Sequence, residues 1–258
     1  MQHFPWEGLF NAKERLFWGY LLSSALIALA YWGYRYRSLP TAQRLKEYWW
    51  SAQARLDYCY FVLSWWIKVA LLAPIIISAK VIALWVNQML SPWIAPLQWA
   101  ISYEWIVLAY TVSLFVFGDF TRYWLHRLLH TNRYLWAFHK VHHSAEALNP
   151  ITFYRVHPVE NFLFGVRYSL SVGLITGVFL TLFGARFNLY TIFGVNALLF
   201  GFSVLGSHLR HSHIPISYGY ILERVFISPA SIKFITATAI IITTTEATLR
   251  FGTQFLVV

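Results

Sequence analysis

The sequence holds a single cysteine, Cys59, and few charged residues. One cysteine excludes an intrachain disulfide and any cysteine-rich zinc or iron–sulfur site. Charged residues make up 12% of the 258 residues, whereas a soluble domain carries roughly a quarter. No DNA- or RNA-binding motif accompanies the net charge of +10, so nucleic acid is not the expected partner. The hydrophobic share of 58% instead predicts that much of the surface faces lipid.

The first residues also lack the pattern of a cleavable signal peptide. Glu7, Lys13, Glu14 and Arg15 fall within them, and no small-residue cleavage site follows the first apolar segment. We therefore expect that segment to be retained as a membrane span.

Five apolar segments approach the ~20 residues that a helix needs to cross the hydrocarbon. They cover residues 16–34, 60–90, 93–117, 168–183 and 187–205. These segments predict an all-α integral membrane protein with about four or five transmembrane helices and a cytosolic helical cap. We expect one membrane domain over 1–258, with N-terminal transmembrane helices in 16–117 and a histidine-rich catalytic region in 118–258.

Basic residues follow the first apolar segment, and they predict the orientation of the chain. Cytoplasmic loops are enriched in lysine and arginine, so residues 35–55 are expected on the cytoplasmic side. The next two spans then return residues 119–161 to that side, and the last two do the same for His208. The predicted localisation is integral to the membrane, with the histidines on the cytoplasmic face. These basic residues are Arg35, Arg37, Arg44, Lys46 and Arg55.

Five of the ten histidines lie close together, in the segments HRLLH and HKVHH. His126 and His130 are four residues apart, and His139, His142 and His143 have spacings of three and four, so each group shares one face of a helix. Neutral imidazole is a good ligand for zinc, copper, iron and nickel. Because five imidazoles exceed the ligand set of one tetrahedral zinc, we interpret the pattern as a two-metal site.

Three other interpretations compete with a two-metal site. Histidines at the lipid headgroups explain any single one of the five but not their common spacing. A bis-histidine haem site uses only two of them, and a Soret band would distinguish it. A metalloprotease site is disfavoured because neither segment carries the glutamate of the HExxH motif.

Two further groups of polar residues accompany the cluster. In the segment GSHLRHSHIP, His208 and His211 are three residues apart and are further candidate ligands, whereas His213 falls off their face and is expected behind the ligands or at the surface. Asp119, Glu146 and Glu160 are candidate acceptors that would fix the tautomer of a ligand, although a solvated or helix-capping role explains each equally well. His157 is better explained as a hydrogen-bonded structural histidine than as a ligand.

The segments HRLLH, HKVHH, RVHP, LRHSHIP and ISPAS together resemble the fatty acid hydroxylase superfamily, which includes sterol desaturases, sterol methyl oxidases and carotenoid hydroxylases. The resemblance covers roughly residues 105–256. It implies a cytosolic histidine cluster with two iron ions, O2 as co-substrate, and an external electron donor of the cytochrome b5, ferredoxin or reductase type. The implied reaction is hydroxylation or desaturation at a C–H bond of a lipid, with no separate side-chain general base.

The last histidine box of that superfamily, HxxHH shortly after Ser-Pro, is missing here. Ser228-Pro229 is present, but residues 232–236 read IKFIT. The chain as written therefore has a second interpretation, a catalytically dead homologue with a metal-binding or lipid-binding role.

A reading-frame change would explain the missing box. If IKFIT is encoded as ATA AAA TTC ATC ACA, one added C and regrouping give CAT AAA ATT CAT CAC, which encodes His-Lys-Ile-His-His. The unusual run ITATAIIITTTEAT at 235–248 fits the same shift. We hypothesise that one base is lost near codon 232 and that the frame returns near codon 250, so that 232–249 is frameshifted. Genuine divergence is the competing explanation.

Overall fold

The computed structural model describes residues 5–97, 101–145, 149–184, 187–189, 191–192 and 195–205. Within them the fold is all-α, as predicted, apart from the two-residue antiparallel strands β1 (Thr191–Ile192) and β2 (Val195–Asn196). The α-helices are α1 (Trp18–Tyr36), α2 (Ala42–Trp50), α3 (Ala52–Ile67), α4 (Ala79–Leu90), α5 (Tyr103–Thr131), α6 (Arg133–His139), α7 (Pro158–Phe183) and α8 (Ala197–Val204). Four short helical turns complete the elements: η1 (Pro5–Leu9), η2 (Lys68–Leu72), η3 (His142–Ser144) and η4 (Thr152–Tyr154).

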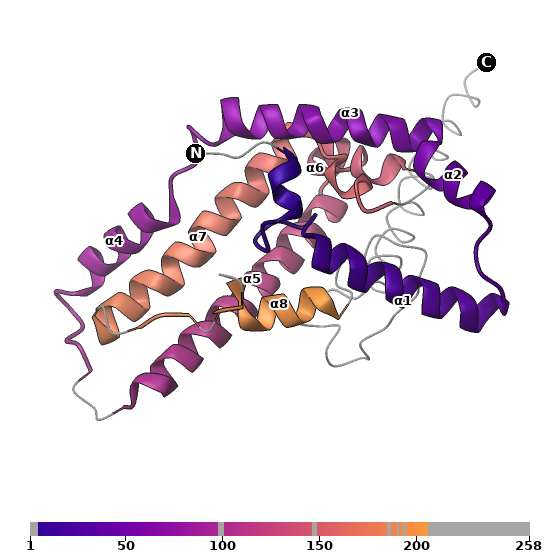
Figure 1. The fold of residues 1–258 in the computed structure, drawn as a ribbon. Coiled ribbons are helices and arrows are strands. Elements are labelled where there is room, and N and C mark those ends of the chain that lie inside the picture. The colour runs from indigo at the N-terminus through magenta and orange to yellow at the C-terminus, as the bar shows by residue number, and fades with distance from the viewer. Residues whose placement is uncertain are drawn as a thin grey trace, which may run out of the picture.

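Helices α5 and α7 pack together at the centre of the fold (Figure 1). They contain 29 and 26 residues, so each is about 40 Å long and exceeds the ~30 Å hydrocarbon core of a bilayer. Only 28% of the most apolar 18-residue window of each helix is buried in the protein. Among the described helices, these two are long and apolar enough to cross a membrane. Their outward apolar surface indicates a membrane protein, and the total of four or five spans stays a prediction.

Helix α7 begins earlier than the apolar segment 168–183 predicted. It starts at Pro158, because a proline at the first helical position has the backbone angle of a helix and needs no N–H partner. His157 precedes it as the N-cap, and its Nδ1 accepts a hydrogen bond from the Val159 backbone N–H at 3.2 Å. Helix α5 likewise runs beyond the predicted 93–117 segment to Thr131. Both extensions bring polar residues to the same end of the α5–α7 pair.

Two apolar segments that were predicted as single continuous helices are divided in the structure. The segment 60–90 is divided, because α3 ends at Ile67, η2 follows as a π-helical turn, and α4 starts afresh where Ser78 accepts a hydrogen bond from the Val81 N–H. The segment 187–205 contains the two short strands and the eight-residue α8. There the Asn196 side chain accepts from two backbone N–H groups and caps a new helix. Hydrophobicity alone did not reveal these polar caps.

Small residues let α4 and α7 approach closely. Ser169, Gly173, Gly177 and Thr181 follow one another at four-residue spacing on α7, and all are buried. A Cβ atom added to Gly177 would lie 2.6 Å from Val86 Cβ. Close packing along such a stripe is typical of helices in membranes, where apolar contact with lipid removes the usual hydrophobic driving force. The stripe therefore fixes α7 against α4.

We expect Gly177→Ala to destabilise the protein, because the added methyl group meets both Val86 and the Ala83 carbonyl oxygen, 2.8 Å away. Overpacking of this kind costs about 1–3 kcal/mol. Thermal unfolding in detergent micelles measures the effect. The matched control is Gly201→Ala in α8, where an added Cβ meets nothing within 4 Å. Equal melting temperatures for the two variants would contradict the packing argument.

Candidate metal centre

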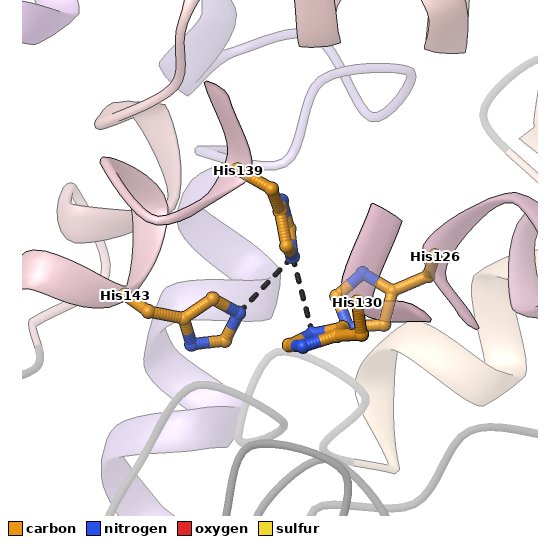
Figure 2. Close-up of side chains that lie close together, drawn as sticks. All are labelled: His126, His130, His139 and His143. Atoms are coloured by element: carbon orange, nitrogen blue, oxygen red, sulfur yellow. Dashed lines mark hydrogen bonds between the residues drawn. The ribbon is translucent and has the colours of Figure 1, made fainter. Parts of the chain in front are cut away.

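Four histidines converge at the end of α5 (Figure 2). His126 and His130 lie on the last two turns of α5, His139 ends α6, and His143 lies in η3. One ligand nitrogen from each lies within 4.8 Å of the other three. Asn132 produces the convergence, because it ends α5 and its Oδ1 accepts hydrogen bonds from the first backbone N–H groups of α6. The chain thus turns back and brings HKVHH against HRLLH.

The spacing of the four rings fits a shared cation. The Nε2 atoms of successive rings in the order His126, His130, His139, His143 are separated by 3.1, 3.2 and 3.1 Å. Nitrogens bound at about 2.0–2.1 Å to one metal ion lie about 3.0–3.4 Å apart. The middle two Nε2 atoms each face two others, yet a neutral ring nitrogen offers only one proton or one lone pair. A metal ion that accepts all four lone pairs satisfies this arrangement better than hydrogen bonds do.

The electrostatics of the site also favour neutral, metal-binding imidazoles. Burial lowers the pKa of His139 to about 4. Burial, together with the neighbouring His142, lowers the pKa of His143 still further. Both rings are therefore unprotonated at neutral pH, which is the state that metal coordination requires.

Glu160 supports the ring of His139 from the first turn of α7. Its Oε2 lies 3.1 Å from His139 Nδ1, and both side chains are buried. A carboxylate beside one ring nitrogen of a histidine favours the proton on that nitrogen, and the other nitrogen then keeps its lone pair for a metal. The donor set present, four imidazoles and one carboxylate behind them, thus fits a first-row transition metal such as iron or zinc.

Two residues that were predicted to support the histidine ligands, Asp119 and His157, lie away from the cluster. Asp119 is about 10 Å before His126 along α5, and it forms an ion pair with Arg122 at 3.2 Å. His157 caps α7 and packs against Phe138, with ring centroids 4.8 Å apart. The structure therefore brings neither into the four-histidine cluster. Glu146, His208, His211 and His213 lie outside the described residues.

His142, the fifth predicted ligand of the early boxes, is buried beside the cluster. Its ring stacks on that of His139 at 5.6 Å, and its Nδ1 lies 3.2 Å from the Arg155 carbonyl oxygen. Arg155 in turn pairs with Asp57 of α3. Sequence reasoning missed Asp57, because its partner Arg155 lies 98 residues further along the chain and no local pattern joins the two.

The comparisons with known proteins agree with this chemistry. Residues 111–234 match the profile of the fatty acid hydroxylase family. A protein assigned as a methylsterol monooxygenase in Dictyostelium discoideum is 39% identical over 69 residues, which are 27% of this chain and 24% of that protein. The alkylglycerol monooxygenase of Homo sapiens is 32% identical over 90 residues, which are 34% of this chain and 18% of that protein.

The chain thus spans less than a quarter of the length of each of these relatives in its matched region. No solved structure matches the chain at comparable significance.

We expect His139→Ala to abolish tight binding of one metal ion, because it removes the ring whose Nε2 meets two others. Glu160→Ala should weaken binding about 10- to 100-fold, since loss of a supporting partner typically has that effect. Anaerobic titration of the purified protein with Fe²⁺ or Zn²⁺ measures both. Glu104→Gln, exposed at the opposite end of α5, is the control. Unchanged affinity in His139→Ala would exclude the cluster as the site.

Proposed function

We propose that the chain, whose residues 111–234 match the fatty acid hydroxylase family, is an O2-dependent oxidoreductase that hydroxylates or desaturates a C–H bond of a lipid through a di-iron centre. One observation carries the proposal. Four neutral imidazoles converge at the end of two long apolar helices, so a redox metal would be held where a membrane lipid can reach it.

The length of α5 supports a position at the membrane surface. A span that begins at Tyr103 crosses the hydrocarbon within ~20 residues, which places His126 just beyond it. We propose that this is the cytoplasmic surface, because the basic residues 35–55 favour that side for the adjoining loop. A substrate would then keep its apolar part in the bilayer while the reacting carbon approaches the metal centre.

The roles of the residues follow from their contacts. Bound iron would supply the oxidising chemistry on O2, with electrons from an external donor of the cytochrome b5, ferredoxin or reductase type. His126, His130, His139 and His143 hold one metal, and Glu160 orients His139. We propose His142, His208 and His211 as ligands of the second metal. The names of the two relatives and of the matching family support a sterol, a fatty acyl chain or a related lipid as the substrate class.

We expect a strain that lacks the gene to lose one oxidised lipid, and the wild-type gene to restore it with label from ¹⁸O2 if the product is hydroxylated. A desaturated product would carry no label but would lack two hydrogens. His130→Ala should restore nothing, because it removes a converging ligand, whereas Glu104→Gln should restore the lipid. Lipid mass spectrometry is the measurement. Identical lipid profiles in the deletion and the wild-type strain would contradict the proposed activity.

A catalytically dead homologue is the second candidate function. The sequence after Pro229 favours it, because residues 232–258 contain no histidine and the family match stops at residue 234. Such a chain would keep the four described ligands and bind one metal or a lipid without turnover.

The reading frame separates the two candidates. We expect renewed sequencing of the gene to reveal one additional base near codon 232 and a compensating change near codon 250, which would restore an HxxHH box at positions 232, 235 and 236. The corrected protein should then bind two iron ions per chain, and the chain as written one metal ion at most. A verified gene that encodes IKFIT in the present frame would refute the frameshift and favour the dead homologue.

A further inference from the structure

One face of α3 contacts the segment that follows the histidine boxes. Gln53, Asp57, Phe61 and Ser64 lie on this face at helical spacing. The Phe61 ring packs edge-on against Tyr154 at 4.8 Å, and the Ser64 hydroxyl donates to the Tyr154 carbonyl oxygen at 3.1 Å. These contacts dock α3 across the end of the α5–α7 pair (Figure 1).

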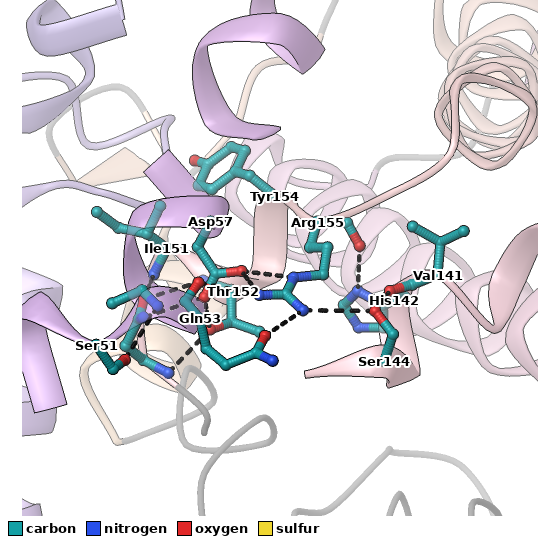
Figure 3. A network of polar contacts seen from close by, with 12 residues as sticks. Ser51, Gln53, Asp57, Val141, His142, Ser144, Ile151, Thr152, Tyr154 and Arg155 are labelled. Atoms are coloured by element: carbon teal, nitrogen blue, oxygen red, sulfur yellow. Dashed lines mark hydrogen bonds and ion pairs between the residues drawn. The ribbon is translucent and has the colours of Figure 1, made fainter. Parts of the chain in front are cut away.

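The strongest contact on this face is the ion pair between Asp57 and Arg155 (Figure 3). Their side chains are 0% and 1% exposed. Asp57 Oδ1 accepts a hydrogen bond from Arg155 Nε at 2.6 Å and lies 2.6 Å from the charged Nη2. Asp57 Oδ2 accepts from the Thr152 hydroxyl at 2.6 Å and from the Asn149 amide at 3.1 Å. Two charges so deeply buried are tolerated only when their hydrogen bonds are satisfied, as they are here.

The same arginine reaches the histidines through its backbone. The Arg155 carbonyl oxygen lies 3.2 Å from His142 Nδ1, and Arg155 Nη1 lies 3.4 Å from the hydroxyl of Ser144 in η3. A carbonyl oxygen can only accept a hydrogen bond, so Nδ1 of His142 carries the proton and Nε2 keeps its lone pair. The side chain of Arg155 is thus anchored to α3 while its carbonyl selects the metal-binding form of His142.

We propose that Asp57 is a positioning residue for the metal centre, which acts through Arg155 to hold His142 in its Nδ1–H tautomer. The proposal deepens the proposed function, because it names the residue that prepares His142 for a metal ion. Asp57 lies outside residues 111–234, the part of the chain that matches the family profile. An N-terminal helix therefore sets the state of a histidine 85 residues further along the chain.

The tautomer itself can be measured without metal or substrate. In metal-free protein with ¹⁵N-labelled histidine, in detergent micelles, the ring nitrogen shifts report which nitrogen is protonated, and His142→Gln assigns the signal. We expect the Nδ1–H form in the wild-type protein and a mixture of tautomers in Asp57→Asn, because the neutral amide no longer anchors the guanidinium. Arg55→Gln, an exposed change on the same helix, should keep the wild-type signal.

A double variant separates positioning from folding. Asp57→Leu/Arg155→Met replaces both buried charges with apolar groups, a change that is often neutral or stabilising. We expect it to melt like the wild-type protein yet to lose the fixed tautomer of His142, which a merely structural role for the ion pair would leave unchanged. If Asp57→Asn does not fold, this variant alone decides the question.

Two results would overturn the proposal. One is an Nε2–H tautomer of His142 in the wild-type protein. The other is an unchanged tautomer of His142 in folded Asp57 variants. Failure of the proposed function gives a different result, a wild-type protein with the Nδ1–H tautomer and bound metal but without oxygen-dependent lipid turnover.

Discussion

The structure depends on holding several imidazoles together, buried and neutral, in a space that a cation would fill. Such a cluster is unfavourable without metal, because buried polar nitrogens face one another and hydrogen bonds satisfy them only in part. The surrounding structure must therefore impose it. Asn132 sets the turn between α5 and α6, Glu160 supports His139 from α7, and Arg155 supports His142 from the following segment. Each support comes from a different element, so the site requires the whole helical end of the molecule.

The membrane provides the second constraint. Helix α5 is long enough to cross the hydrocarbon and still project two turns beyond it, and those turns carry His126 and His130. Because α7 runs alongside with Glu160 in its first turn, both helices contribute polar residues at the same level. The small-residue stripe holds α7 against α4 by close packing. In lipid the hydrophobic effect does not drive two apolar helices together, so this packing is needed. Apolar length and polar ends would thus position the proposed metal centre relative to the lipid.

The sequence predicted the parts of this arrangement that depend on local spacing. The all-α class and the shared faces of His126 and His130 follow from helical periodicity, and the family resemblance is confirmed by the match over 111–234. The boundaries were less predictable. The segments 60–90 and 187–205 look continuous by hydropathy, but Ser78 and Asn196 start new helices within them. The Asp57–Arg155 pair was invisible, because it joins positions 98 residues apart whose partnership no local pattern records.

The number of available histidine ligands shows what the missing last histidine box would change. The four converging histidines satisfy one metal ion, and they come entirely from residues 126–143. His142 lies beside them with its own support from Arg155 but outside their convergent set. The proposed second metal would therefore need ligands from later in the sequence, where His208 and His211 occur and where residues 232–258 contain no histidine. In the proposed di-iron centre both positions must be filled, so the first site could form in either reading frame, whereas the second would depend on the hypothesised frame change. A fixed tautomer of His142 would then contribute to metal binding only in a protein that retains all the histidine ligands of the second metal.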